Sequence, residues 1–265
     1  MNIAEYLHSF DLYSWQIISL LILAGFMVGI INTLAGSGTV ITYSLFMLLG
    51  LPAGVANGTI RLGVIMQTLS ASLNFKRQHV LDLKKGIILG IPTTLGSVVG
   101  ARIAVSINED IFQIIVGIVM LFMLLLIFIN PTNWISGKSD LVKKKTNALQ
   151  WLVFFIIGVY GGFIHIGVGI FLLAGLVLMA GYDLVKANAL KVFIVFLYSP
   201  FALLVFMYND HIHYGMGIVS SIGNIFGGFV ASQFAVLWGA KFLRWFLIIV
   251  IFLFSVKLFG IDRLF

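Results

Sequence analysis

The sequence predicts an all-α polytopic membrane protein, because of its composition and its long apolar runs. Hydrophobic residues make up 61% of the chain and charged residues only 9%, whereas a soluble domain carries about 25% charged residues. Several apolar runs exceed the roughly 18 residues that mark a helical membrane span. The runs do not alternate apolar and polar residues as the strands of a membrane barrel do. Helices are the remaining way to satisfy the backbone polar groups in lipid.

Ten apolar segments can be counted along the chain. The second and the seventh have roughly 12 to 14 residues, a length that suits half-helices, tilted helices or re-entrant helices better than full spans. In order, the segments are Trp15–Leu34, Val40–Leu51, Val55–Phe75, Gly86–Val105, Ile111–Ile129, Leu149–Ile164, Gly167–Ala180, Ala187–Met207, Tyr214–Trp238 and Phe242–Phe259.

The lysine-rich linker 131–148 divides the chain into two membrane repeats, 1–130 and 149–265, of about five segments each. Residues of the same type recur in the same order in both halves, which indicates an internal duplication. Downstream pairs lie 131 residues apart, and upstream pairs lie 133 apart. The pairs are Gly50 with Gly181, Ala56 with Ala187, Asn57 with Asn188, Gly86 with Gly217, Gly96 with Gly227, Gly25 with Gly158, Gly29 with Gly162, and Gly36 with Gly169.

Charge predicts that the two repeats are inverted. The connection 76–85 holds four Lys or Arg residues, whereas its counterpart 209–213 holds none. Basic loops remain in the cytoplasm, so these corresponding connections belong on opposite faces of the membrane. We expect the linker to be cytoplasmic, both termini to face outward, and the protein to lie in the cell's inner membrane.

Inverted repeats are typical of secondary transporters that work by alternating access, and their substrate sites lie at broken helices in matching positions. Two glycine-rich breaks, 32–39 and 161–169, occupy such positions. Glycine lets the backbone leave helical geometry, and the freed N–H groups at a helix start can hold an anion. The alternative is that these glycines only allow close packing between helices.

Two bases within the apolar segments, Arg61 and Lys191, also point to an anion. Every acidic residue lies in a loop or near a segment end, so a buried base needs another negative partner. Snorkelling of both bases to the headgroups is the alternative. His165 is the intramembrane side chain that titrates most readily near neutral pH, which makes it a candidate for pH-dependent anion release. The alternative is that His165 hydrogen-bonds a backbone carbonyl freed by the break. The expected substrate-binding residues are Asn32, Gly36, Ser37, Gly38, Thr39, Asn57, Thr59, Arg61, Gln67, His165, Gly167, Gly169, Asn188 and Lys191.

Two other functions are alternatives for the same residues, an intramembrane hydrolase and an anion channel. Ser37 and His165 could form an intramembrane hydrolase pair, but no nucleophile elbow or third orienting group accompanies them. An anion channel would need a continuous polar pore. No ATP-binding motif occurs, and neither a cofactor nor a metal is expected. The expected partners are a small anion and the lipid bilayer, with no nucleic acid; a homodimer is left open.

The chain resembles the sulfite exporter TauE/SafE family, also called the toluene sulfonate uptake permeases, over nearly its whole length. The motifs that carry the resemblance are Gly25-Phe26-x-x-Gly29, Gly36-Ser37-Gly38, Leu49-Gly50-Leu51-Pro52, Asn57-x-Thr59-x-Arg61, Gly96-x-x-x-Gly100-Ala101-Arg102 and the region of Lys191. The resemblance implies export or uptake of a sulfur-containing anion such as sulfite, a sulfonate or sulfoacetate.

The sequence departs from the family pattern at three places. The second break reads His165-Ile166-Gly167-Val168-Gly169 where the family often has Gly-Pro-Gly-Thr-Gly. Arg61 replaces the usual lysine, and Ile60 stands where asparagine is common. The transporter class survives these changes, whereas the identity of the anion does not follow.

The predicted topology can be tested with single cysteines, since the chain has no native cysteine. A cysteine at Gln78 or Lys143 should react with an impermeant thiol reagent only from the cytoplasm, and one at His211 only from outside. Labelling of positions 78 and 211 from the same side would contradict the inverted arrangement.

Overall fold

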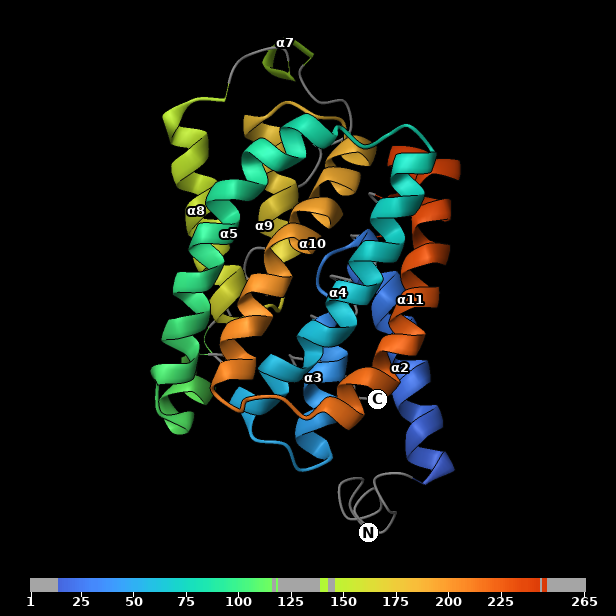
Figure 1. Ribbon diagram of the computed structural model, residues 1–265. Coiled ribbons are helices and arrows are strands. Elements are labelled where there is room, and N and C mark those ends of the chain that lie inside the picture. The colour runs from blue at the N-terminus through green and yellow to red at the C-terminus, as the bar shows by residue number, and fades with distance from the viewer. Residues whose placement is uncertain (1–13, 116–117, 119–138, 143–145, 244, 247–265) are drawn as a thin grey trace, which may run out of the picture.

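The computed structural model of the protein describes residues 14–115, 118, 139–142, 146–243 and 245–246. Over these residues the chain is a bundle of helices with no strand (Figure 1). The elements in chain order are α2 Trp15–Leu34, α3 Thr39–Leu48, α4 Ala53–Arg77, α5 Leu83–Ser106, α7 Ser139–Val142, α8 Ala148–Phe163, α9 Val168–Ala174, the π-helical turn η2 Gly175–Met179, α10 Leu184–Tyr208 and α11 Tyr214–Leu237.

Four of these helices, α2, α5, α10 and α11, are long and apolar enough to cross a membrane. The predicted all-α membrane fold is therefore confirmed. Helix α4 is equally long, but it carries a row of buried polar side chains that includes Asn57, Arg61 and Gln67. Most of the predicted fifth and tenth segments, Ile111–Ile129 and Phe242–Phe259, lie outside the described residues. The short helix α7 within the linker was not predicted.

The two short apolar segments form hairpins with the helices before them. Helix α3 follows α2 after four residues, and α9 follows α8 after four. In Figure 1, α2 and α4 begin at one end of the bundle, whereas α8 and α10 begin at the other. Since only four residues separate α3 from α4 and η2 from α10, each short helix returns to the end at which its hairpin started. Both hairpins are thus re-entrant, one from each end.

The helices pack as two three-helix groups that each combine both halves of the chain. Helix α11 packs against α2 and α4, while α5 packs against α8 and α10. We call α2, α4 and α11 the first bundle, and α5, α8 and α10 the second bundle. The bundles meet along α4 and α10, which run in opposite directions (Figure 1). This exchange of helices is the arrangement that inverted repeats would produce, although duplication itself stays a prediction.

Close glycine contacts place α2 and α8 in a register that differs from the sequence pairing. A Cβ at Gly29 would lie 2.8 Å from the carbonyl oxygen of Asn224, and one at Gly158 would lie 2.2 Å from that of Thr93. Asn224 and Thr93 are 131 residues apart, so these equivalent contacts match Gly29 with Gly158. The sequence pairing of Gly25 with Gly158 is therefore displaced by four residues, about one helical turn.

The two breaks have the same length but place their positive-φ glycine differently. Gly36 and Gly167 both have positive φ, 80° and 74°, a conformation that glycine adopts without a steric penalty. One residue, Ala35, separates Gly36 from the end of α2. Three residues separate Gly167 from the end of α8, and His165 is the middle one. His165 thus lies before the left-handed glycine of its break, where the first break has no such side chain.

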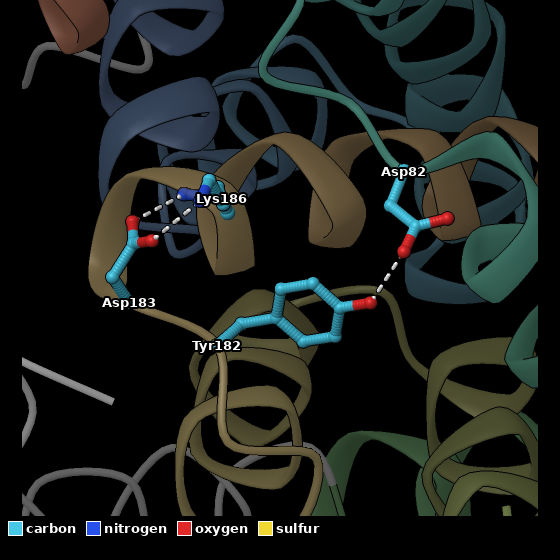
Figure 2. A network of polar contacts seen from close by, with 4 residues as sticks. All are labelled: Asp82, Tyr182, Asp183 and Lys186. Atoms are coloured by element: carbon cyan, nitrogen blue, oxygen red, sulfur yellow. Dashed lines mark hydrogen bonds and ion pairs between the residues drawn. The ribbon is translucent and has the colours of Figure 1, made fainter. Parts of the chain in front are cut away.

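A hydrogen bond joins the two halves at the end of the bundle where α5 and α10 begin. The hydroxyl of Tyr182, in the loop before α10, donates to a carboxylate oxygen of Asp82 over 2.6 Å (Figure 2). The other Asp82 oxygen accepts from the backbone N–H of Lys85 and so caps α5. Burial and the bond to Asp82 raise the pKa of Tyr182, so its hydroxyl remains a donor. Nearby, Lys186 pairs with Asp183 on the exposed side of α10.

Candidate functional site

The two breaks touch where the re-entrant hairpins cross. A Cβ at Gly36 would lie 2.5 Å from the Cα of Gly169, and a Cβ at Gly169 would lie 2.4 Å from the Cα of Gly36. Real Cβ atoms do not approach backbone so closely, so any larger residue would push the hairpins apart. Glycine is required here for close approach, and at Gly36 also for its positive φ. The glycines that were expected at the site are therefore also the ones that allow the close packing.

Lys191 reaches this crossing from α10. Its Nζ donates to the backbone carbonyl oxygens of Thr33 and Asn32, at 2.8 and 3.2 Å. These carbonyls belong to the last turn of α2, where the oxygen of Thr33 has no backbone N–H partner and that of Asn32 also accepts from the N–H of Gly36 over 2.9 Å. The side chain is 2% exposed, so Lys191 does not snorkel. It closes the end of a helix that belongs to the other bundle.

Arg61 makes the corresponding contacts from α4. Its Nη1 donates to the carbonyl oxygen of Gly161 over 3.1 Å, and its Nη2 donates to that of Gly162 over 2.6 Å. The guanidinium also lies over the ring of Phe206, 4.5 Å from its centroid. Its Nε is buried and has no hydrogen-bond partner. Like Lys191, Arg61 holds the last turn of a helix in the opposite bundle.

Both bases therefore lie at helix ends, whereas the glycine-rich breaks predicted an anion at helix starts. Carbonyl groups at the end of a helix carry the negative pole of its dipole, so a cation is favoured there. No carboxylate pairs with either base among the described residues. The partners of the two bases are these two pairs of carbonyl groups. The sequence did not reveal them, because each pair comes from the other half of the chain.

A small cavity lies beside Lys191 at the crossing. Six expected site residues line it together with Thr68, Val168, Val192 and Val195, which sequence reasoning missed. Thr68 follows Gln67 directly, and the two α10 valines flank the helix face of Lys191, so a helical projection could have found them. The interior has room for about one water molecule. The six expected residues that line the cavity are Asn32, Gly36, Gln67, His165, Gly169 and Lys191.

A chain of amide hydrogen bonds fixes the polar wall of this cavity. Asn32 Nδ2 donates to Gln67 Oε1 over 3.0 Å, and Gln67 Nε2 donates to Thr33 Oγ1 over 2.9 Å. These bonds tie α4 to the last turn of α2, within the first bundle. The second bundle supplies the opposite wall with His165, whose Nδ1 lies 3.1 Å from the Tyr198 hydroxyl. Tyr198 was not among the expected ligands of the site.

Asn57 and Asn188, the repeated asparagines, differ in their contacts. Asn57 Nδ2 donates to the carbonyl oxygen of Phe163, the last residue of α8, over 2.8 Å. Asn188 is fully buried, yet neither its Oδ1 nor its Nδ2 has a hydrogen-bond partner. An unpaired buried amide is costly. The two halves are thus in different states at equivalent positions.

The remaining expected residues lie around the breaks and not on the cavity. Thr59 points elsewhere, because its hydroxyl bonds Val55 and accepts from the backbone N–H of His213. Gly38 and Gly167 directly precede α3 and α9. The hydroxyls of Ser37 and Thr39 are buried without a partner. Since Ser37 has no bond to His165, the hydrolase pair is not assembled.

Replacing Arg61 tests its role at the end of α8. Arg61→Gln should leave the carbonyls of Gly161 and Gly162 without their cationic donors, at a cost of about 1–3 kcal/mol for each unsatisfied group. Hydrogen–deuterium exchange should become faster in residues 164–168, while Arg61→Lys should restore part of the protection. Arg102→Gln, at an exposed position near the end of α5, is the control. Unchanged exchange in Arg61→Gln would contradict this role.

The chain matches a family of known proteins over most of its length. Residues 21–258 match the family described as sulfite exporter TauE/SafE. The chain is 27% identical to a probable membrane transporter protein of a Sinorhizobium species over 92% of this chain and 93% of that protein. It is 26% identical to a probable membrane transporter protein of Haemophilus influenzae over 92% and 94% of the two chains. No solved structure matches the chain. The match over most of its length shows that this chain belongs to the sulfite exporter TauE/SafE family of membrane transporters.

Proposed function

We propose that the protein is a secondary transporter that moves a small organic or sulfur-containing anion by alternating access, and that the anion binds at Lys191 where the two hairpins cross. The observation that carries the proposal is the buried amino group of Lys191 beside a polar cavity without a carboxylate. An ammonium has three N–H donors, and the carbonyls of Asn32 and Thr33 use two of them. The third is available to an anion in the cavity.

The lining of the cavity favours an anion without an amino group. None of the described lining residues is acidic, so an ammonium group on the substrate would find no charged partner. The side chains of Asn32, Gln67 and His165 supply polar groups that suit sulfite or a sulfonate oxygen. The cavity holds about one water molecule as it stands, so the bundles must separate for such an anion to enter. This structure thus corresponds to an occluded, substrate-free state of the proposed cycle.

The cations also explain how an anion would set the bundles in motion. Arg61 belongs to the first bundle and bonds the end of α8 in the second, while Lys191 belongs to the second bundle and bonds the end of α2 in the first. We call these two sets of hydrogen bonds the clamps. An anion at Lys191 takes the third N–H and repels the α2 carbonyl oxygens that share the same ammonium. Binding therefore weakens one of the two clamps that join the bundles. A ligand shifts a conformational equilibrium only through such differential contacts.

The inverted arrangement supplies the second state. In the other state of the cycle, the first break would adopt the contacts that the second break has here, and the second break would adopt those of the first. The unlike contacts of Asn57 and Asn188 support this view, since equivalent side chains already differ. In this other conformation, we expect Asn188 to donate to the carbonyl oxygen of Leu34, the counterpart of Phe163.

Binding to purified protein tests the proposal. Wild type should bind sulfite or sulfoacetate in isothermal titration, and proteoliposomes should exchange the anion that binds. Lys191→Gln should weaken binding at least tenfold because the ammonium is lost. Lys186→Gln is the matched control, since this lysine lies on the same helix but is exposed and paired with Asp183. Equal binding by wild type and Lys191→Gln would refute the site, and no binding by wild type would refute the substrate class.

A further inference from the structure

Lys191 can lose a proton without losing a hydrogen bond. The amine form keeps two N–H donors and gains a lone pair, and the structure uses two donors, for Asn32 and Thr33. The clamp on α2 is therefore satisfied by the ammonium and by the amine alike. Arg61 differs, because a guanidinium stays charged in proteins. Of the two buried bases, only Lys191 is built to change its charge.

The surroundings of Lys191 make its charge depend on an anion. The side chain is 2% exposed, and no carboxylate pairs with it among the described residues. Burial disfavours the charged form, while a nearby negative charge favours it. When the cavity is empty, the carbonyl dipoles alone oppose the cost of burying the ammonium. When an anion occupies the cavity, it supplies the missing charge.

We propose that Lys191 takes up a proton when the anion binds, so that the transporter carries one proton together with each anion. This inference rests on the proposed function and names its coupling ion. In the binding step the amine lone pair accepts a proton from solvent, and the resulting ammonium donates its third N–H to the anion. For a singly charged anion, the proton and the anion together add no net charge to the buried site. Release reverses both events on the other side.

Few other titratable groups lie on the helices around Lys191. Neither α2, α9 nor η2 contains one. His165 shares the cavity, Arg61 stands on α4, Tyr160 on α8, and Tyr198 on α10 itself. Those of α5 lie near its ends, and α11 has only Tyr214 at its start. His165 is the competing proton carrier. Its Nδ1 contacts Tyr198 and its ring bonds no helix-end carbonyl, so protonation there would not be shared with a clamp.

The test is proton uptake during anion binding by the intact protein. Sulfoacetate and sulfite are titrated calorimetrically in two buffers of different ionisation enthalpy, and the uptake by sulfite itself is subtracted. Where Lys191 is mostly neutral in the empty protein, wild type should take up about one proton for each anion. Its affinity should then fall about tenfold per unit rise in pH, as linkage requires. Binding by wild type without proton uptake overturns the inference and leaves the proposed function standing. No binding overturns both.

Two variants identify the residue. Lys191→Arg keeps a cation that cannot discharge, so bound anion should bring no proton and affinity should be flat over the same pH range. His165→Asn should keep the uptake of wild type. If His165→Asn abolishes the uptake, or if Lys191→Arg retains it, Lys191 is not the proton carrier. Should Lys191→Arg fail to bind, the wild-type uptake and its persistence in His165→Asn still decide the question.

Discussion

The structure depends on the need to satisfy carbonyl groups where two helices end inside the bundle. The last turns of α2 and α8 present backbone oxygens among buried residues. Lys191 and Arg61 supply the donors, each from a long helix of the opposite bundle. Without these contacts the breaks would leave acceptors unsatisfied in a medium that penalises them strongly. The bases thus allow helices to end within the bundle, and such a helix end is the precondition for the proposed binding site.

The same contacts create a conflict that a transporter can use. A charged Lys191 or Arg61 buried without a described carboxylate is costly, and carbonyl dipoles compensate that cost only in part. In the proposed function, an anion would relieve the cost at Lys191 and would repel the α2 carbonyl oxygens that Lys191 bonds. Gly36 and Gly169 bring the hairpins so close that the anion would lie next to the contact between the bundles. Recognition of charge and movement of the bundles would then be parts of one event.

Hydropathy predicted most of the architecture, because a span must be apolar over a fixed length. The first segment agrees with α2 at both ends, and the two short segments are the re-entrant α3 and the α9–η2 pair. The predicted pairing of α2 with α8 was displaced by one helical turn for a physical reason. Glycines recur every four residues at Gly25 and Gly29, so a displacement by one turn matches almost as well. Only the carbonyls that those glycines meet distinguish the two registers.

The site was predicted in part for a similar reason. Polar residues in an apolar segment stand out, which is how Asn32, Gln67 and Lys191 were found. Their partners did not stand out, since the carbonyls of Thr33 or Gly162 belong to any sequence. His165 was identified from its side chain, but its place before the left-handed glycine of the second break follows only from the backbone conformation. Contacts between the halves depend on the fold and cannot be predicted from the sequence of either half alone.

The central claim is that an anion binds beside Lys191 at the hairpin crossing. A structure of the protein with selenite, in which selenium replaces the sulfur of sulfite, would test this claim directly through the anomalous signal of selenium. We predict a single strong peak within hydrogen-bonding reach of Lys191 Nζ, between the two breaks. A peak at the basic connection 76–85, or none at the crossing while selenite competes with sulfite for binding, would contradict the account.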